Sequence, residues 1–258
     1  MSEANKILIV EDEADTAYIL GLLLKKNNFE AKIATNGKEA LELLKDFTPQ
    51  VIIADWNMPV MNGIELTQHL KNSLDTSHIP VIMLTAKSSL EDQIEGIESG
   101  AEAYILKPFN MTYVRVVISN LLKQRNIIQS KYIQNKDNGF SDLKITSKDE
   151  KFLNDVTQLI LDNYSDPEFN IEKLVENSYV SRTVFYHKIK SLTGLTPIDF
   201  LRQKRLHIAS QMILETDYNV SEIALITGFN DAKNFSKRFK EIYRLTPTQY
   251  KQEMLGQN

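Results

Sequence analysis

Three carboxylates stand at the ends of short apolar runs. Glu11 and Asp12 directly follow the run of residues 6–10, and Asp55 directly follows the run of residues 51–54. If these runs are neighbouring strands of a parallel sheet, the carboxylates converge on one crevice at the carboxyl ends of the strands. Carboxylates that share a crevice repel one another and shift each other's pKa values unless a cation neutralises them. Mg²⁺ is the expected ion, because it prefers a few carboxylate oxygens together with waters and a phosphoryl oxygen.

A hydroxyl and an ammonium are expected at the same edge. Thr85 ends a fourth apolar run, and Lys107 follows the fifth. A carboxylate nucleophile, a metal ion, a hydroxyl and a cation together suit an in-line phosphoryl transfer onto Asp55. Taken singly, each residue has an ordinary alternative as a turn residue, a helix cap or a solvated charge. The occurrence of all five at the ends of four strands favours the phosphoryl-transfer site.

The elements that would position this site are five apolar runs that alternate with amphipathic stretches. The runs are too short to be buried helices, whereas residues 16–26 and 37–45 repeat Leu and Ala at the spacing of one helical face. Short strands buried on both faces and joined by helices predict an α/β fold with a parallel, doubly wound sheet. The strand order that we expect for it is the flavodoxin-like 2-1-3-4-5. The expected strands are residues 6–10, 31–34, 51–54, 81–84 and 103–106.

The composition limits the class of protein. The 258 residues include no Cys, which excludes disulfides, thiolate metal sites and Cys nucleophiles. No apolar run approaches the roughly 20 residues that cross a bilayer, so we expect a cytoplasmic protein with no membrane segment. Of the 30 basic and 34 acidic residues, 11 and 17 precede residue 125, which leaves 19 and 17 from residue 125 onward. The acidic first part suits a cation site, and the weakly basic second part allows an anionic partner such as DNA.

Four segments of the first part resemble the receiver domains of two-component response regulators. They are Ile7-Leu-Ile-Val-Glu-Asp12, Asp55-Trp-Asn-Met-Pro59 with Gly63, Met83-Leu-Thr-Ala86 and Tyr104-Ile-Leu-Lys-Pro-Phe109, and the resemblance spans residues 5–124. It implies that Asp55 is the phosphoacceptor and that Lys107 contacts the phosphoryl group. The implied Mg²⁺ ligands are Glu11, Asp12, Asp55 and the backbone carbonyl of Asn57. Many receivers have Asp in place of Glu11, a departure that still permits metal binding.

The resemblance also implies a switch. Thr85 would move toward the phosphoryl oxygen and Tyr104 would rotate inward, which changes the surface around the fourth helix, the fifth strand and the fifth helix. The alternative for Tyr104 is an ordinary core aromatic. The Lys107–Pro108 peptide is expected to be cis, which is tolerable only before proline.

A change of pattern marks a domain boundary. Residues 126–148 are rich in Gln, Asn, Lys, Asp and Ser, which is typical of an exit helix that runs into a linker. We therefore expect a first domain at residues 1–125, a linker at residues 126–148 and an all-α domain at residues 149–258.

The second domain contains an internal repeat at an offset of 50 residues. Phe185 falls on Phe235, and the two copies of Leu-Thr-Pro at residues 195–197 and 245–247 coincide. In each copy Thr can cap a helix and Pro can occupy its first turn. The repeat predicts two copies of one helical unit.

Each copy reads as two helices joined by a short turn. The first copy comprises residues 171–177, a turn at 178–180 and a helix at 181–192 that stops at Gly194, and the second comprises residues 221–227, 228–230 and 231–243. Residues 197–215 can form one long helix between them. The stripes expected to be buried are Phe185, Ile189 and Leu192 in the first copy and Phe235, Phe239 and Ile242 in the second.

The outer faces of the second helices are basic. No acid occurs from residue 177 to residue 198, and the outward side chains can read base edges or bind phosphates. A basic face is also commonly just solvated, but two equivalent faces on repeated units favour DNA. The outward residues are Arg182, Thr183, Tyr186, His187 and Lys190 in the first copy and Lys233, Asn234, Lys237, Arg238 and Lys240 in the second.

Residues 150–254 resemble AraC-type DNA-binding domains. The resemblance rests on Ser221-Glu-Ile-Ala-Leu-Ile-Thr-Gly-Phe229, on Phe235-Ser-Lys-Arg-Phe-Lys240 and on Thr246-Pro-Thr-Gln-Tyr250. It implies two recognition helices that enter successive major-groove segments about 34 Å apart. The implied base contacts are Arg182, Thr183, Tyr186, His187, Ala232, Lys233 and Lys237. Ala232 offers only an apolar contact, so the second helix would rely more on phosphates.

The junction at residues 145–152 resembles the C-terminal part of hybrid two-component proteins, so the chain is either a free-standing regulator or a fragment of such a hybrid protein. We expect a phosphoacceptor and transcription regulator rather than an enzyme. A cognate histidine kinase would phosphorylate Asp55, and the phosphorylated homodimer would bind double-stranded DNA. One alternative is a receiver whose helical half is a protein-docking module. The other is a metal-dependent phosphohydrolase, which Asn57 disfavours because such enzymes use a second Asp at that position.

Overall fold

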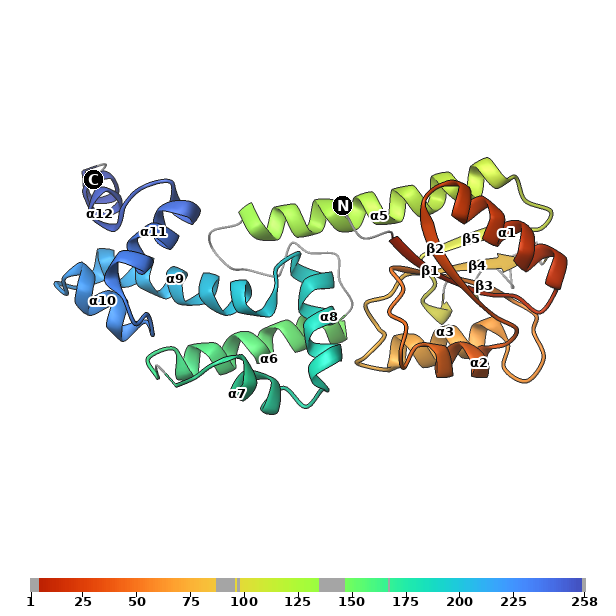
Figure 1. Ribbon diagram of the computed structural model, residues 1–258, viewed down its shortest axis with the longest axis horizontal. Helices are drawn as coiled ribbons and strands as arrows, with labels where there is room; N and C mark the ends of the chain where they lie inside the picture. Colours follow the sequence, from red (N-terminus) through yellow and green to blue (C-terminus); the bar gives the residue numbers. More distant parts are fainter. Residues whose placement is uncertain (1–4, 87–95, 97, 135–146, 167, 257–258) are drawn as a thin grey trace. The chain divides into compact units, whose positions relative to one another are not determined.

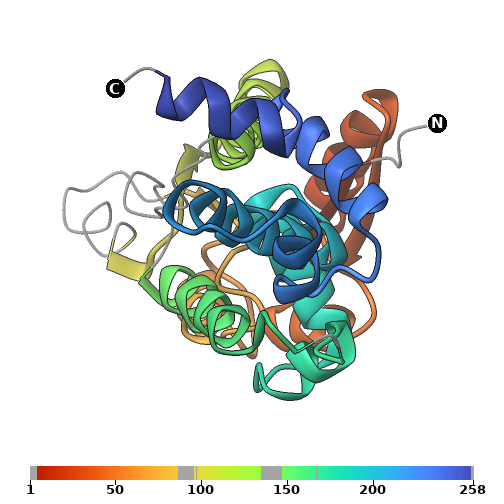
Figure 2. The same cartoon turned by 90° about the vertical axis from the view of Figure 1, so that its left-hand side faces the viewer.

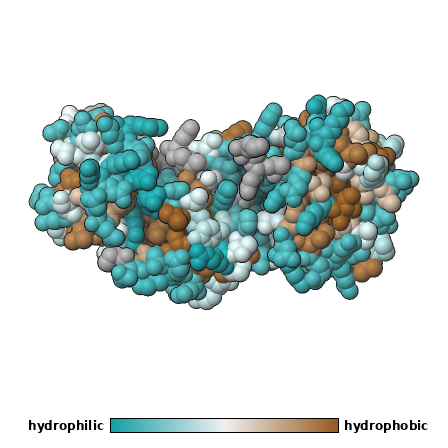
Figure 3. Space-filling model, in the orientation of Figure 1, coloured by the Kyte–Doolittle hydropathy of each residue, from teal (hydrophilic) through white to brown (hydrophobic). Residues whose placement is uncertain are grey.

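The computed structural model describes residues 5–86, 96, 98–134, 147–166 and 168–256. The chain divides into two compact units, Met1–Ile127 and Ile128–Asn258. Hydrophilic residues cover most of the face drawn in Figure 3, with smaller hydrophobic patches between them. Among the helices of these described ranges, none is long and apolar enough to span a bilayer.

The first unit is built on a sheet of five parallel strands in the order β2-β1-β3-β4-β5. This confirms the predicted fold class and strand order. The strands are β1 Asn5–Val10, β2 Phe29–Ala34, β3 Val51–Asp55, β4 Val81–Thr85 and β5 Ala103–Leu106. The helices are α1 Ala14–Lys26, α2 Gly37–Leu43, α3 Gly63–Asn72 and α5 Met111–Gln134, and α5 continues past the boundary of the unit.

Alternate residues of the central strands enter two different cores. Leu8, Ile52 and Met83 pack with α2 and α3 on one face of the sheet. Ile9 and Ile53 pack with α1 and α5 on the other face. Helices therefore cover both faces, as Figure 1 shows. This layering is why β1, β3 and β4 have almost continuous apolar sequences.

The expectation that all five strands are buried on both faces is wrong for the two edge strands. β1, β3 and β4 are almost wholly buried, whereas β2 and β5 each have one buried residue and are otherwise half-buried or exposed. An edge strand has a neighbour on one side only, so helices cover it incompletely. β2 also begins at Phe29, two residues before the predicted start.

The helices of the first unit begin at residues with short polar side chains. Asn36 caps α2 by accepting a hydrogen bond from the Glu39 backbone N–H. Asn62 caps α3 in a reciprocal capping box with Glu65. The expected fourth helix falls largely on residues 87–95 and 97, which lie outside the described residues.

The described part of the second unit is helical. Its helices are α6 Ser147–Asn163, α7 Ile171–Glu176, α8 Arg182–Thr193, α9 Pro197–Glu215, α10 Val220–Ile226, α11 Ala232–Tyr243 and α12 Pro247–Leu255. Within this unit, α9 runs between α6–α8 and α10–α12 (Figure 1), and Figure 2 shows the same helices turned by 90°. The long helix predicted for residues 197–215 is confirmed.

The predicted 50-residue repeat is confirmed in the bounds and ends of the helices. α8 and α11 each have 12 residues and begin 50 residues apart. Ser181 caps α8, and Asp231 caps α11. Both helices end at a left-handed residue, which is Gly194 in the first copy and Arg244 in the second. Thr196 and Thr246 cap the helices that follow, each with Pro in the first turn.

The buried stripes agree with the prediction at five of six positions. Phe185, Ile189 and Leu192 are buried, and so are Phe235 and Phe239. The exception is Ile242, which is only half-buried. Tyr243 takes the inner place instead, because its ring stacks on Phe239 and its hydroxyl donates a hydrogen bond to Ser210 Oγ.

The segment that the sequence assigns to a linker, residues 126–148, begins within α5, which continues to Gln134. Residues 135–146 lie outside the described residues, and α6 begins at Ser147.

Candidate functional site

The structure brings Glu11, Asp12 and Asp55 together. One carboxylate oxygen from each residue lies within 4.8 Å of the other two. β1 and β3 are hydrogen-bonded neighbours, so the residues at their carboxyl ends meet. Glu11 and Asp55 are buried, whereas Asp12 is exposed. The cluster is therefore reached from solvent on the side of Asp12.

Lys107 bridges the two buried carboxylates. Its Nζ lies 2.8 Å from Glu11 Oε2 and 2.9 Å from Asp55 Oδ1. The peptide that follows, Lys107–Pro108, is cis, as the resemblance implied. When all four of these described groups are ionised, three carboxylates and one ammonium sum to a charge of −2. A divalent cation is the ion that neutralises such a site.

Burial and charge act against each other at these groups. Burial raises the pKa of the Glu11 and Asp55 carboxyls, and the hydrogen bonds from Lys107 partly oppose that rise. Burial lowers the pKa of Lys107, but its bonds to the two carboxylates outweigh burial, so the net pKa is raised. The ammonium stays protonated, and the carboxylates are costly to ionise without a further cation. A set of hard carboxylate oxygens fits Mg²⁺.

Thr85 and Asn57 also lie at the carboxyl ends of neighbouring strands. Thr85 ends β4, which pairs with β3, and Asn57 lies in the loop after β3. Thr85 is buried at the end of β4, and its backbone carbonyl accepts a hydrogen bond of 2.7 Å from the Lys107 N–H. Asn57 is exposed, two residues beyond Asp55. The structure therefore brings the predicted hydroxyl and ammonium to the same edge of the sheet as the carboxylates.

Tyr104 is held inward on β5. It is half-buried, and its hydroxyl donates a hydrogen bond to the backbone carbonyl of Gly96 and lies 3.4 Å from Ser99 Oγ. Burial raises the pKa of the Tyr104 hydroxyl. A Cβ at Gly96 would lie 2.5 Å from the Tyr104 ring, so the inward ring needs glycine at that position.

Gly63 sets how closely α3 approaches the end of β3. A Cβ at Gly63 would lie 2.2 Å from the backbone carbonyl oxygen of Asp55 and 2.7 Å from Met83 Sδ. The Gly63 N–H donates to the Trp56 carbonyl at 3.0 Å. Only glycine fits there, and α3 consequently supports the backbone that carries Asp55.

The first of the two basic helices, α8, presents Arg182, Thr183 and His187 to solvent, while Tyr186 is half-buried. The Arg182 guanidinium lies 5.4 Å from the Tyr186 ring centroid. Its Nη2 also lies 3.3 Å from a carboxylate oxygen of Glu172 on α7. The expectation of a purely basic face therefore needs correction, because the neighbouring helix α7 contributes an acid.

The second basic helix, α11, exposes Lys233, Asn234 and Lys237. Ala232 is half-buried at its first turn. Arg238, which the sequence assigned to the outward set, is also half-buried, and its Nη1 lies 2.9 Å from Glu241 on the same helix. Arg238 is thus already engaged within α11.

The second unit contains a buried ion pair that the sequence does not predict. Lys188 on α8 pairs with Asp149 on α6 at 2.5 Å, and both side chains are almost completely buried. The Lys188 ammonium also lies 5.3 Å from the Phe152 ring centroid. The partners are 39 residues apart, and no local spacing connects them, so the sequence carries no signal for the pair.

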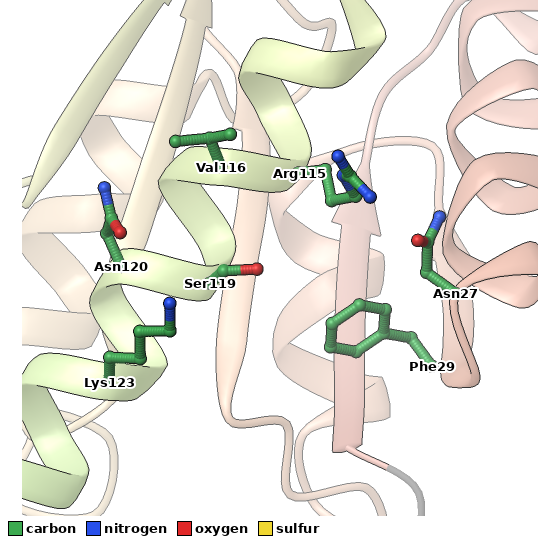
Figure 4. Close-up of a pocket in the computed structure, with 7 residues that line it drawn as sticks. All are labelled: Asn27, Phe29, Arg115, Val116, Ser119, Asn120 and Lys123. Carbon is green, nitrogen blue, oxygen red and sulfur yellow. The ribbon is translucent and has the colours of Figure 1, made fainter.

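A cavity of about 380 Å³ lies apart from the carboxylates. Figure 4 shows its lining, which is Asn27, Phe29, Arg115, Val116, Ser119, Asn120 and Lys123. Phe29 starts β2, whereas the carboxylates follow the ends of β1 and β3, so the cavity is at the opposite edge of the sheet. The residues that line it include two cations and no acid, which makes it unsuited to a metal ion.

Comparisons with known proteins agree with both units. A family model described as a response regulator receiver domain matches residues 7–119. A second model, described as a helix-turn-helix domain, matches residues 174–253. The first region contains the carboxylate cluster and Lys107, and the second contains α8 and α11.

Individual relatives match over different shares of the chain. Histidine kinase P4 of Formosa agariphila is 39% identical over 96% of this chain, which spans only 18% of that protein. The probable transcriptional regulator ycf29 of Pyropia yezoensis is 31% identical over 74% of this chain and 87% of its own length. The solved receiver domain of a signal transduction histidine kinase from Syntrophus aciditrophicus is 36% identical and covers 46% of this chain and 91% of its own, with a TM-score of 0.45.

Proposed function

Because this chain belongs to the two-component response regulators that join a receiver domain to an AraC-type helix-turn-helix domain, we propose that phosphorylation of Asp55 controls sequence-specific DNA binding by α8 and α11. A histidine kinase is the proposed phosphate donor. That donor is supported by the relative that matches nearly the whole chain, which is itself named a histidine kinase.

The observation that carries the proposal is the contact of Lys107 with both Glu11 and Asp55 beside a third carboxylate. Asp55 is the proposed nucleophile: its carboxylate oxygen forms the bond to phosphorus while the P–N bond of the kinase phosphohistidine breaks and the imidazole leaves. Lys107 lies where it can stabilise the charge on the transferred phosphoryl group. Glu11, Asp12, Asp55 and the backbone carbonyl of Asn57 would hold Mg²⁺. When bound there, the ion would supply positive charge to the phosphoryl oxygens.

The chemistry at Asp55 is tested with a small phosphodonor such as acetyl phosphate. Mass spectrometry of the full chain with Mg²⁺ present should find one added phosphoryl group, which peptide mapping assigns to Asp55. The Asp55→Asn variant should not gain it. The matched control is Asp46→Asn, because Asp46 is an exposed carboxylate outside the cluster and its loss should leave phosphorylation unchanged. Equal labelling of the Asp55→Asn protein would refute the assignment.

The switch is proposed to run from Thr85 to Tyr104. Thr85 ends β4 beside the cluster, and Tyr104 on the adjacent strand β5 pairs with Met83 of β4. A new phosphoryl group that draws the Thr85 hydroxyl toward it would change the space beside Tyr104. The receiver surface would then shift toward a form that self-associates, which raises the local concentration of DNA-binding helices at tandem sites.

The proposed DNA contacts divide into base-reading and phosphate-binding residues. The candidates for contacts with base edges or DNA phosphates are Arg182, Thr183, Tyr186 and His187 on α8 and Lys233, Asn234 and Lys237 on α11. Ala232 is proposed as an apolar contact with a base, and Arg238 as a contact at the edge of the interface. The ring contact between Arg182 and Tyr186 supports this role, because it pre-orders the long arginine side chain.

A measurement of salt dependence separates DNA binding from the docking alternative. Phosphate contacts make DNA affinity fall steeply as salt rises, since each contact releases counterions. A helical unit that only docks onto proteins would have no such salt-dependent affinity for DNA. The phosphohydrolase alternative would require multiple turnover of a small phosphoester.

A further inference from the structure

Arg205 joins the two helix-turn-helix units of the helical domain. It lies on α9 and is half-buried. Its Nη2 donates hydrogen bonds to the backbone carbonyls of Phe169 at 2.9 Å and Asp166 at 3.1 Å, in the loop that leads into α7. Its Nη1 donates to the carbonyl of Gly228 at 3.4 Å, in the turn between α10 and α11. One guanidinium therefore contacts both helix-turn-helix units of the helical domain.

The turn at Gly228 is shaped to receive this guanidinium. Gly228 has a left-handed φ of +76°, which glycine adopts without a steric cost. A Cβ at this position would lie 2.7 to 2.9 Å from three atoms of the Arg205 guanidinium. Any other residue would push the arginine away from the turn. The glycine thus serves both the backbone conformation and the contact.

The other contacts of α10–α12 with α9 combine an apolar cluster with two hydrogen bonds, from the Tyr243 hydroxyl to Ser210 Oγ and from Lys251 Nζ to the Thr216 carbonyl. Leu206, Ala209 and Ile213 of α9 pack against Phe235 and Phe239 of α11 in one hydrophobic cluster. Apolar contact is non-directional and fixes rotation or sliding poorly. Hydrogen bonds from a rigid, planar guanidinium are directional, and bonds to a charged donor are stronger than neutral ones. Because Arg205 also bonds to the loop before α7, it is suited to fix the orientation of α10 and α11 relative to α7 and α8.

We propose that Arg205 is a positioning residue that fixes the separation and rotation of α8 relative to α11, so that the protein selects DNA by the distance between its two half-sites. The inference rests on the proposed DNA-binding function. It makes Arg205 act through α8 and α11, without touching the bases itself.

The test measures the dissociation constant of the full chain, with phosphodonor present, on a DNA duplex selected from a random pool by the wild-type chain. The same duplex is made with two base pairs inserted between the half-sites. We expect the insertion to weaken wild-type binding by at least about tenfold, since half-site spacing is set by protein geometry. In Arg205→Gln the original duplex should bind more weakly, and the insertion should cost less than about threefold.

Two further variants make the outcome decisive. Arg202→Gln is the matched control, because Arg202 lies on the same helix and its guanidinium is 2.6 Å from Asp199 in the first turn of α9; it should keep the wild-type insertion penalty. Arg205→Lys keeps the positive charge but loses the planar guanidinium that donates to three carbonyls. Circular dichroism checks that each variant is folded. If Arg205→Gln does not fold, the proposal is tested with Arg205→Lys. We expect the insertion to weaken DNA binding by this variant less than it weakens binding by the wild type.

The two proposals fail in different ways. A wild-type chain that binds no DNA would remove the proposed function. A wild-type chain that is selective for spacing, together with a folded Arg205 variant that keeps the full insertion penalty, would overturn the role of Arg205 and leave the proposed function intact.

Discussion

Replacing Lys188 by Met should destabilise the helical unit more than any exposed substitution on α8. The Lys188 side chain is 0% exposed and that of its partner Asp149 is 2% exposed. Replacing Lys188 removes the cation 2.5 Å from the buried Asp149 carboxylate, and breaking a buried pair in this way typically costs about 3–5 kcal/mol. Replacing both partners, as Lys188→Met with Asp149→Leu, removes both buried charges. The double variant should therefore lie within about 1 kcal/mol of wild type or above it.

Urea unfolding followed by two signals measures this effect. Far-ultraviolet circular dichroism follows the helices, whereas the fluorescence of Trp56, the only tryptophan of the chain, follows the receiver unit. Lys188→Met should lower the circular dichroism midpoint and leave the Trp56 midpoint unchanged. Lys190→Met is the matched control, because Lys190 is exposed on the same helix, and it should change stability by no more than about 0.5 kcal/mol.

The reasoning would be refuted by a Lys188→Met protein within about 1 kcal/mol of wild type. A double variant that costs as much as the sum of the two single variants would also refute it, because the two groups would then not interact.

Three further predictions concern single positions. Gly63→Ala should lower receiver stability by about 1–3 kcal/mol in urea, because its Cβ would meet the backbone at the end of β3. Gly21→Ala, whose Cβ meets only an ordinary contact at 3.7 Å inside α1, should instead stabilise by about 0.5–1 kcal/mol; equal effects would contradict the account. Burial lowers the pKa of Lys204 from 10.5 to about 8, so the unfolded chain binds more protons in that window and stability should rise with pH between those values. Lys204→Met should lose that rise and be more stable at pH 7 by up to about 3 kcal/mol, and parallel pH profiles would disprove it. Tyr179 is 98% exposed at a left-handed φ of +58°, so Tyr179→Gly should raise the thermal stability by about 1 kcal/mol. The control Tyr218→Gly, at an exposed position without a positive φ, should not raise it, and a gain at Tyr218 as large as at Tyr179 would count against backbone strain.

The sequence carries the parts of the fold that follow from local periodicity. The positions of the strands follow from the apolar runs. Once β1 and β3 are neighbours, the approach of Glu11 to Asp55 follows as well, because carboxyl ends of neighbouring parallel strands must meet. The repeat identified α8 and α11 to within one residue at each end, because each copy has its own cap and its own stop.

The parts that the sequence does not carry depend on contacts between distant residues. The pairing of Lys188 with Asp149 and the three carbonyls around Arg205 join positions that no periodicity relates. The exchange of Ile242 for Tyr243 in the core depends on ring stacking and on a hydroxyl partner in α9. Tertiary packing decides between such neighbouring positions, because helical periodicity alone does not distinguish Ile242 from Tyr243 as the buried residue.

The most direct test of the central claim is a footprint on the DNA upstream of the coding sequence of this chain, made with and without a small phosphodonor. For the wild type we predict protection of two neighbouring major-groove segments that appears at lower protein concentration after phosphorylation. Asp55→Asn should protect the same segments equally with and without the donor. Equal protection by the wild type in both conditions would contradict control of DNA binding by Asp55.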